Sequence, residues 1–176
     1  MLNKLEMEPI KDNLGLIIGY DIHINDINPI HLRVMDVYNK VNKPEIESDD
    51  ADDCLVKALA IALRKSYDET YDLVYKTARQ LGVSTLSASV MDKLLKENGY
   101  NYTFGNTYGK SLLDFFKVAD IIHSTSTYVV LCNGHTFTIE NGIIYEKLNY
   151  SEDDDYAVTL SYYLNPNVGV LRVYEK

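Results

Sequence analysis

The chain has 176 residues, of which 46% are hydrophobic and 24% charged, a composition that fits one globular domain with a substantial core. The formal net charge is −9. Non-specific binding to nucleic acid needs clustered Lys and Arg, so we expect no nucleic-acid partner. No apolar run approaches the roughly 18 residues of a membrane span, and residues 1–6 lack the apolar core of a signal peptide, so we expect a cytoplasmic protein and no membrane contact.

The N-terminal third of the chain gives mixed signals. Residues 1–12 are polar and predict an irregular arm, whereas residues 14–24 are β-branched and partly alternating and predict a strand. The Asn-Pro pair at 28–29 can open a helix, and apolar residues then recur at helical spacing at Ile30, Val34, Val37 and Val41. Their β-branched side chains leave a strand open as an alternative.

An acidic linker over residues 42–53 leads into the stretch that we place at the centre of the protein. Residues 53–64 predict a helix that is apolar on nearly every side, as is typical of a buried helix. Cys54 falls in the first turn, at the positive end of the helix dipole, where thiolate is favoured over thiol. The thiolate is the nucleophile, so Cys54 is a candidate for covalent chemistry. The alternative is a small, inert core residue.

Helical signals continue beyond this stretch and are followed by strand signals. Ser66 and Glu69 form a capping box before a helix that should end at Leu81, with Gly82 as its C-cap, and a third helix should run from Ser87 or Ser89 to Asn98. Next we expect a short strand at 100–104, a helix start at 111, and strands over 125–131, 135–139, 143–146, 156–164 and 168–174. Asn133-Gly134 and Asn141-Gly142 predict hairpin turns. Helices followed by an antiparallel meander indicate an α+β fold.

Two residues of the predicted sheet complete a candidate site with Cys54. His135 stands at the mouth of the first hairpin, and Asn149 follows the end of the next strand. Antiparallel neighbours return the chain to the same end, so an Asn149 amide could accept from one ring N–H and aim the other ring nitrogen at a thiol. Glu146 and Asp153 are weaker candidates for this orienting role. Asn141 is better explained by its turn.

We expect no metal, no cofactor and no structural disulfide. A reduced compartment disfavours a disulfide between Cys54 and Cys132, and two cysteines with scattered histidines do not match the clustered ligand pairs of a zinc site. Cys132 alternates with an apolar strand residue and should pack in the core. His23, His31 and His123 show no partner pattern and should be structural or surface residues.

Several short motifs keep a recognisable order over about residues 50–150: Asp53-Cys54 before an apolar helix, Ser66-Tyr67-Asp68-Glu69-Thr70-Tyr71, Gly134-His135 and Asn141-Gly142. This order resembles the papain-like cysteine hydrolase and peptidase superfamily, and most strongly its small, largely uncharacterised members from bacteria and phages. The resemblance implies a single papain-like domain in which a helical part (51–119) carrying the nucleophile helix packs on a C-terminal antiparallel sheet (120–176). Residues 1–50 would be an N-terminal extension, either an arm over the cleft or part of the core.

The resemblance also implies a thiol-dependent hydrolase, a cysteine peptidase or amidase, that cleaves a peptide, isopeptide or related acyl bond of a peptide or protein substrate through Cys54, His135 and Asn149. One departure concerns the oxyanion. Papain-like enzymes usually place a Gln or Asn shortly before the cysteine, whereas this chain has Ser-Asp-Asp-Ala-Asp-Asp at residues 48–53. A carboxylate would repel an oxyanion, which leaves Ser48 and the Cys54 backbone N–H as candidate donors. Losing one donor typically costs about 10²–10³ in rate.

That departure supports an alternative without catalysis. A weak or inactive papain-like scaffold could act as an acidic binding or inhibitor protein, directed at a host factor in the host cytoplasm if the chain is phage-encoded. Transglutaminase-like acyl transfer is a third hypothesis and shares the nucleophile. Reactivity of Cys54 separates the first two, because an enzyme needs an activated thiol and a binder does not.

Overall fold

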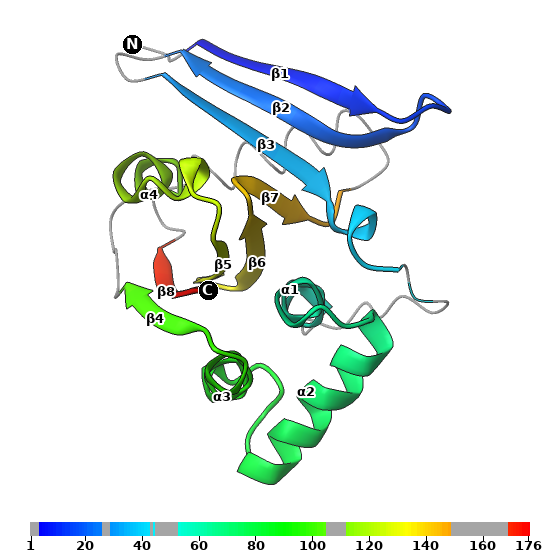
Figure 1. Cartoon of the computed structure of the whole chain (residues 1–176), viewed down its shortest axis with the longest axis vertical. Helices are drawn as coiled ribbons and strands as arrows, with labels where there is room; N and C mark the ends of the chain where they lie inside the picture. The colour runs from blue at the N-terminus through cyan, green and yellow to red at the C-terminus, as the bar shows by residue number, and fades with distance from the viewer. Residues whose placement is uncertain (1–3, 26–28, 43, 45–52, 105–111, 149–168) are drawn as a thin grey trace.

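The computed structural model describes residues 4–25, 29–42, 44, 53–104, 112–148 and 169–176. Within these residues the chain forms one eight-stranded sheet and four α-helices (Figure 1), which confirms the predicted α+β class. Several predicted features lie outside the described residues: most of the acidic linker, the strand over 156–164, and the candidate residues Ser48, Asn149 and Asp153.

The sheet has the strand order β1 (Lys4–Lys11), β2 (Ile17–Asn25), β3 (Ile30–Asp36), β7 (Ile143–Glu146), β6 (His135–Glu140), β5 (Thr127–Cys132), β8 (Val170–Glu175) and β4 (Asn101–Phe104). Strands β5, β6 and β7 form an antiparallel meander, as predicted, and β8 pairs antiparallel with β5. The N-terminal strands join them through β3 and β7, which are parallel. The sheet curves, with helix α4 (Leu112–Ala119) on its concave side and α1 (Asp53–Leu63), α2 (Tyr67–Leu81) and α3 (Ala88–Glu97) on the opposite side (Figure 1).

The prediction of an irregular arm over residues 1–12 is wrong, because Lys4–Lys11 forms strand β1 and pairs with β2 along its length. β1 is an edge strand, and its exposed glutamates, Glu6 and Glu8, alternate with a partly buried Met7. Pro9 is compatible with this place because an edge strand leaves one side of its backbone without a partner strand. Because β1 is a half-exposed edge strand, the hydrophobic alternation in its sequence is too weak to predict a strand.

The predicted helix after Asn28-Pro29 is also wrong, and the strand that the β-branched residues left open is found instead. Ile30–Asp36 forms β3, with Leu32 and Val34 fully buried at alternate positions. A short 3-10 helix, Val37–Asn39, then turns the chain, capped by the Asp36 carboxylate that accepts from the Tyr38 N–H at 3.0 Å. The N-terminal strands are therefore part of the main sheet and its core.

The helices on the convex side follow the sequence closely. Ser66 and Glu69 form the predicted capping box of α2, and Gly82 ends that helix in a left-handed conformation. Ser87 caps α3. Helix α1 lies against β6, and the Thr138 hydroxyl donates to the Ala58 carbonyl at 2.8 Å. This buried bond fixes the helix to the strand that begins with His135.

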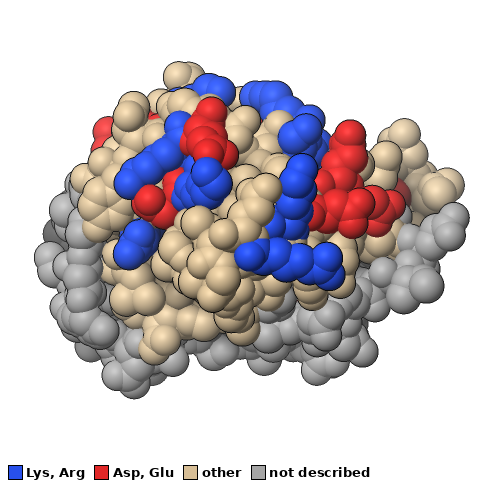
Figure 2. Space-filling view, turned by 90° about the horizontal axis from the view of Figure 1, so that it is seen from below, with Lys and Arg blue, Asp and Glu red and all other residues tan. Residues whose placement is uncertain are grey.

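The surface over α2 and α3 mixes both signs of charge. Figure 2 shows Lys and Arg side chains lying beside Asp and Glu on this face, as expected for a solvated helix surface.

A second 3-10 helix, Ile121–His123, connects α4 to β5. Among the described residues, no helix has the length and apolar character needed to cross a membrane.

Candidate active site

Cys54 occupies the place that the sequence predicts for it. Helix α1 begins at Asp53, so the thiol lies in the first turn, where the backbone N–H groups have no partner within the helix. The side chain is partly exposed and is not in a disulfide. The positive end of the helix dipole favours negative charge on the sulfur at this position.

His135 is the first residue of β6 and follows the predicted two-residue turn. Cys132 and His135 are paired across this turn, and Gly134 has φ +79°, a conformation that favours glycine. The imidazole stacks on Phe137 with ring centroids 5.8 Å apart. Its Nε2 atom lies 2.7 Å from Oε2 of Glu146, at the end of β7. The strand backbone and these two neighbours hold the ring in one orientation.

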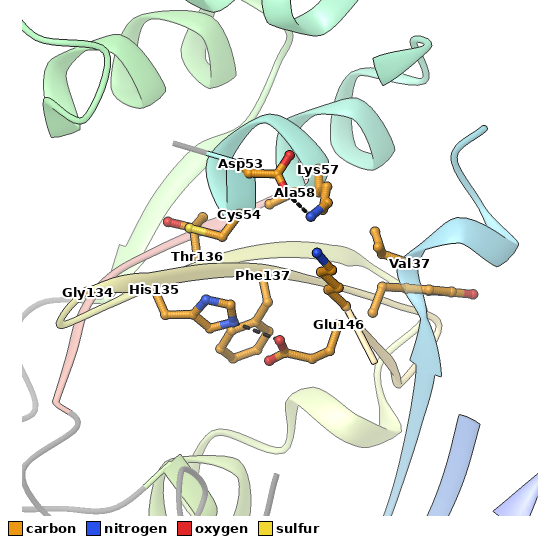
Figure 3. Close-up of a pocket in the computed structure, with 12 residues that line it drawn as sticks. Val37, Asp53, Cys54, Lys57, Ala58, Gly134, His135, Thr136, Phe137 and Glu146 are labelled. Atoms are coloured by element: carbon orange, nitrogen blue, oxygen red, sulfur yellow. Dashed lines mark hydrogen bonds and ion pairs between the residues drawn. The ribbon is translucent and has the colours of Figure 1, made fainter. Parts of the chain in front are cut away.

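The structure brings Cys54 and His135 into contact. Their side chains are hydrogen bonded, and because Nε2 faces Glu146, Nδ1 is the ring nitrogen left for the thiol. Figure 3 shows His135 between Cys54 on one side and Glu146 on the other. The three side chains form a continuous row from nucleophile to base to carboxylate, the geometry that a thiol-imidazole pair with an orienting group requires.

Electrostatics in this row favour charge separation. Burial disfavours the thiolate, but the hydrogen bond and positive charge of His135, with help from the Thr136 backbone N–H, lower the pKa of Cys54 below its ordinary value. Burial also opposes a charged imidazole, yet the charge of Glu146 and the hydrogen bonds that the ring donates to Cys54 and Glu146 raise the pKa of His135 to about 10. Both shifts favour a thiolate–imidazolium pair over a neutral thiol beside a neutral imidazole.

The carboxylate of Glu146 holds the orienting position that the sequence analysis assigned to Asn149, with Glu146 ranked below it. Asn149 itself lies outside the described residues. In the β6–β7 hairpin, Glu140 pairs with Ile143 and Thr138 with Tyr145, which places Glu146 opposite Phe137 and diagonal to His135. Diagonal neighbours on a sheet are about 7–8 Å apart, within reach of a long side chain. The tight Asn141-Gly142 turn was the sequence signal for this register.

Asp53, beside the nucleophile, does not present a bare carboxylate to the site. It is buried, and it forms an ion pair with the buried ammonium of Lys57 one turn along α1. The Tyr67 hydroxyl, at the start of α2, donates to its other oxygen. This group of three was missed by the sequence analysis, although an Asp and a Lys four residues apart in an apolar helix are a visible signal. Of the two predicted oxyanion donors, Ser48 lies outside the described residues and the Cys54 backbone N–H is at the helix start.

A cleft of about 320 Å³ opens at the row of three side chains. Its lining includes charged groups from both sides of the site, Asp53 and Lys57 on α1 and Glu146 at the end of β7 (Figure 3). Lys147, directly after β7, is also part of the lining. Val37 and Tyr145 supply apolar surface. We call it the polar cleft. Among the described residues, no group of three or more His, Cys, Asp or Glu side chains could hold a metal ion.

The remaining cysteine and histidines lie as the sequence analysis expected. Cys132 is 1% exposed and belongs to the core. His23 and His31 stack on each other on neighbouring strands with centroids 4.4 Å apart, and His31 hydrogen bonds to Asp21. His123 is largely exposed. None of these three histidines is among the residues that line the polar cleft.

None of the protein-family profiles, curated protein sequences or solved structures compared with this chain matches it.

Proposed function

We propose that the protein is a thiol-dependent hydrolase in which Cys54 is the nucleophile, His135 the general base and acid, and Glu146 the positioning residue. The observation that carries the proposal is the hydrogen-bonded row Cys54–His135–Glu146 at the mouth of a cleft. A thiol at a helix start, an imidazole and a carboxylate that fixes that imidazole are the three parts of nucleophilic catalysis by cysteine.

The reaction follows from these positions. The Cys54 thiolate attacks the substrate carbonyl carbon and forms a C–S bond, while the carbonyl π electrons move to the oxygen. Collapse of this intermediate breaks the C–N bond, and the His135 imidazolium gives its proton to the departing amine. His135 then takes a proton from water, the resulting hydroxide attacks the thioester, and the C–S bond breaks to restore the thiolate and release a carboxylic acid.

Stabilisation of the oxyanion is assigned to the N-terminus of α1. The Cys54 backbone N–H is close to the reacting sulfur, and the helix dipole adds positive potential. The expected repulsion by acidic residues is reduced at Asp53, because Lys57 and Tyr67 take up its two oxygens. This weakens one objection to catalysis, whereas the non-catalytic alternative rests on the missing Gln or Asn donor before the cysteine and on the net charge of −9.

The arrangement also supports the papain-like interpretation of the sequence. The nucleophile lies at the start of a buried helix, the histidine begins the adjacent strand, and the positioning group follows on the next strand. By analogy with that superfamily we assign peptide, isopeptide or related acyl bonds as the reaction class.

The test is the rate of alkylation of Cys54 by iodoacetamide from acid to alkaline pH, read by peptide mass spectrometry in wild type and His135→Ala. An ordinary thiol has a pKa of about 8.5 and activated thiols about 3.5–7.5. We expect wild-type Cys54 to react fast at mildly acidic pH and His135→Ala to lose that reactivity. Buried Cys132 in the same digest is the internal control. A Cys54 that behaves as an ordinary or inert thiol in both proteins would overturn the proposal and favour a binding protein that tolerates Cys54→Ala.

A further inference from the structure

Cys54 and His135 lie between two clefts rather than at the end of one. The second cleft, of about 400 Å³, opens on the α3 side of the nucleophile. Both clefts share Cys54, Gly134, His135 and Thr136 in their lining. A substrate whose reactive carbonyl lies at the sulfur therefore meets a different surface on each side.

The second cleft differs from the polar cleft in its chemistry. No Asp, Glu, Lys or Arg is among its described lining residues, whereas the polar cleft has two of each sign. Most of its lining is apolar and comes from α1, the α2–α3 loop, α3, β5 and β8: Leu55, Leu86, Met91, Leu131, Cys132 and Leu171. We call it the apolar cleft.

The apolar cleft has a buried floor and an exposed rim. Leu55, Met91 and Cys132 are at most 5% exposed and form the floor. Leu86, in the loop between α2 and α3, is 57% exposed at the rim. An exposed leucine by itself is ordinary. Here it continues an apolar surface that reaches the nucleophile, which is the usual character of a ligand pocket.

A local irregularity in β8 contributes to this surface. In the β5–β8 pair, Leu131 is opposite Arg172 and Cys132 is opposite Val170, so Leu171 has no partner across the ladder. Bulges of this kind re-aim a side chain and are frequent beside active sites. Leu171, the extra residue, is part of the lining of the cleft.

From these observations we infer that the apolar cleft binds an aliphatic group of the substrate next to the bond that Cys54 attacks. The inference rests on the proposed hydrolase function and adds its substrate class: an acyl compound or peptide with an aliphatic group on the α3 side and a polar or charged group on the side of Lys57, Glu146 and Lys147. Complementary apolar contact on one side and charged groups on the other would also fix which way round the substrate lies.

The experiment uses three alkylating reagents with the same iodoacetyl group: N-iodoacetyl-glycinamide, N-iodoacetyl-leucinamide and N-hexyl-iodoacetamide. In each, the Cys54 thiolate forms a C–S bond as the C–I bond breaks and iodide leaves. Burial of one methylene corresponds to roughly a fourfold change in affinity. We therefore expect at least one aliphatic reagent to label Cys54 about 10-fold faster than the glycinamide at subsaturating concentration. Faster labelling by the leucinamide assigns a branched peptide side chain, and faster labelling by the hexyl reagent assigns an unbranched alkyl chain.

Two variants localise the effect. Leu86→Asp places a charge at the rim and should remove most of the aliphatic preference, which is read within that variant as the ratio of each aliphatic rate to the glycinamide rate. Leu16→Asp is the matched control, because Leu16 is 59% exposed and is not one of the residues that line the cleft. This variant should keep the aliphatic preference. Equal rates for all three reagents in wild type, or an unchanged preference in Leu86→Asp, would overturn the inference. A slow glycinamide rate that is insensitive to His135→Ala would instead reject the proposed function.

Discussion

Replacing Glu146 with Gln tests how much the negative charge of Glu146 raises the pKa of His135. Gln keeps the length of the side chain and an oxygen that can accept from His135 Nε2, but it removes the negative charge that helps to raise the pKa of His135 to about 10. An opposite charge within hydrogen-bond distance shifts a pKa by about 1–3 units. We therefore expect the pKa of His135 to fall by about one unit or more in Glu146→Gln, and one unit corresponds to about 1.4 kcal/mol. Both side chains are at least three-quarters buried, so solvent screens little of this.

The assay is the NMR titration of the imidazole nitrogens in protein labelled at histidine. The chain has four histidines, and His135→Ala identifies the signal of the fourth. Glu175→Gln is the matched control, because Glu175 is also a partly buried carboxylate at a strand end and its partner is Tyr128 rather than a histidine. A pKa of His135 that is the same in wild type and Glu146→Gln would refute the assignment of Glu146 as the positioning residue.

The remaining predictions concern stability and pH. Lys57→Met leaves Asp53 as a buried charge without its counter-ion, so it should lower the free energy of unfolding in urea titrations by about 3–5 kcal/mol. Adding Asp53→Leu in a double variant should restore much of that free energy. Gly142→Ala should destabilise the protein strongly, because Gly142 has φ +75° and an added Cβ would lie 2.1 Å from a backbone oxygen. Gly82 has φ +65° but open space around it, so Gly82→Ala should cost only about 1–2 kcal/mol. Thermal melts of the two variants make the comparison. Stabilisation by protonated His135 should be complete below pH 6.5 and disappear as the pH rises through about 10. The measurement is the urea midpoint at each pH, and this pH dependence should be absent in His135→Ala.

Local signals in the sequence were enough for the helices and hairpins. The capping box at Ser66 and the two Asn-Gly turns depend on neighbours in the chain, and the structure follows them. The N-terminal strands were harder, because β1 is a half-exposed edge and β3 pairs in parallel with a strand more than a hundred positions later. No local pattern encodes such a pairing.

In the candidate site, too, the residues at local sequence signals were predicted, and a contact between two helices was not. Cys54 and His135 were predictable because each sits at a local signal, a helix start and a hairpin mouth. Glu146 was underrated because an amide just past the strand looked better placed, yet counting the register from the Asn141-Gly142 turn puts Glu146 diagonal to His135. The contact of Tyr67 with Asp53 joins two helices and could not be derived from spacing alone.

The parallel pairing of β3 with β7 has a consequence for how the thiol becomes reactive. Val37, directly after β3, lines the polar cleft, and Tyr38 places its ring 5.5 Å from the Lys57 ammonium. The walls of the site therefore come from segments that meet only when β6 and β7 are in place. Long-range pairing of this kind is intrinsically slow to form. A chain emerging from the ribosome would carry Cys54 as an unremarkable thiol, and its nucleophilicity would arise together with the finished sheet.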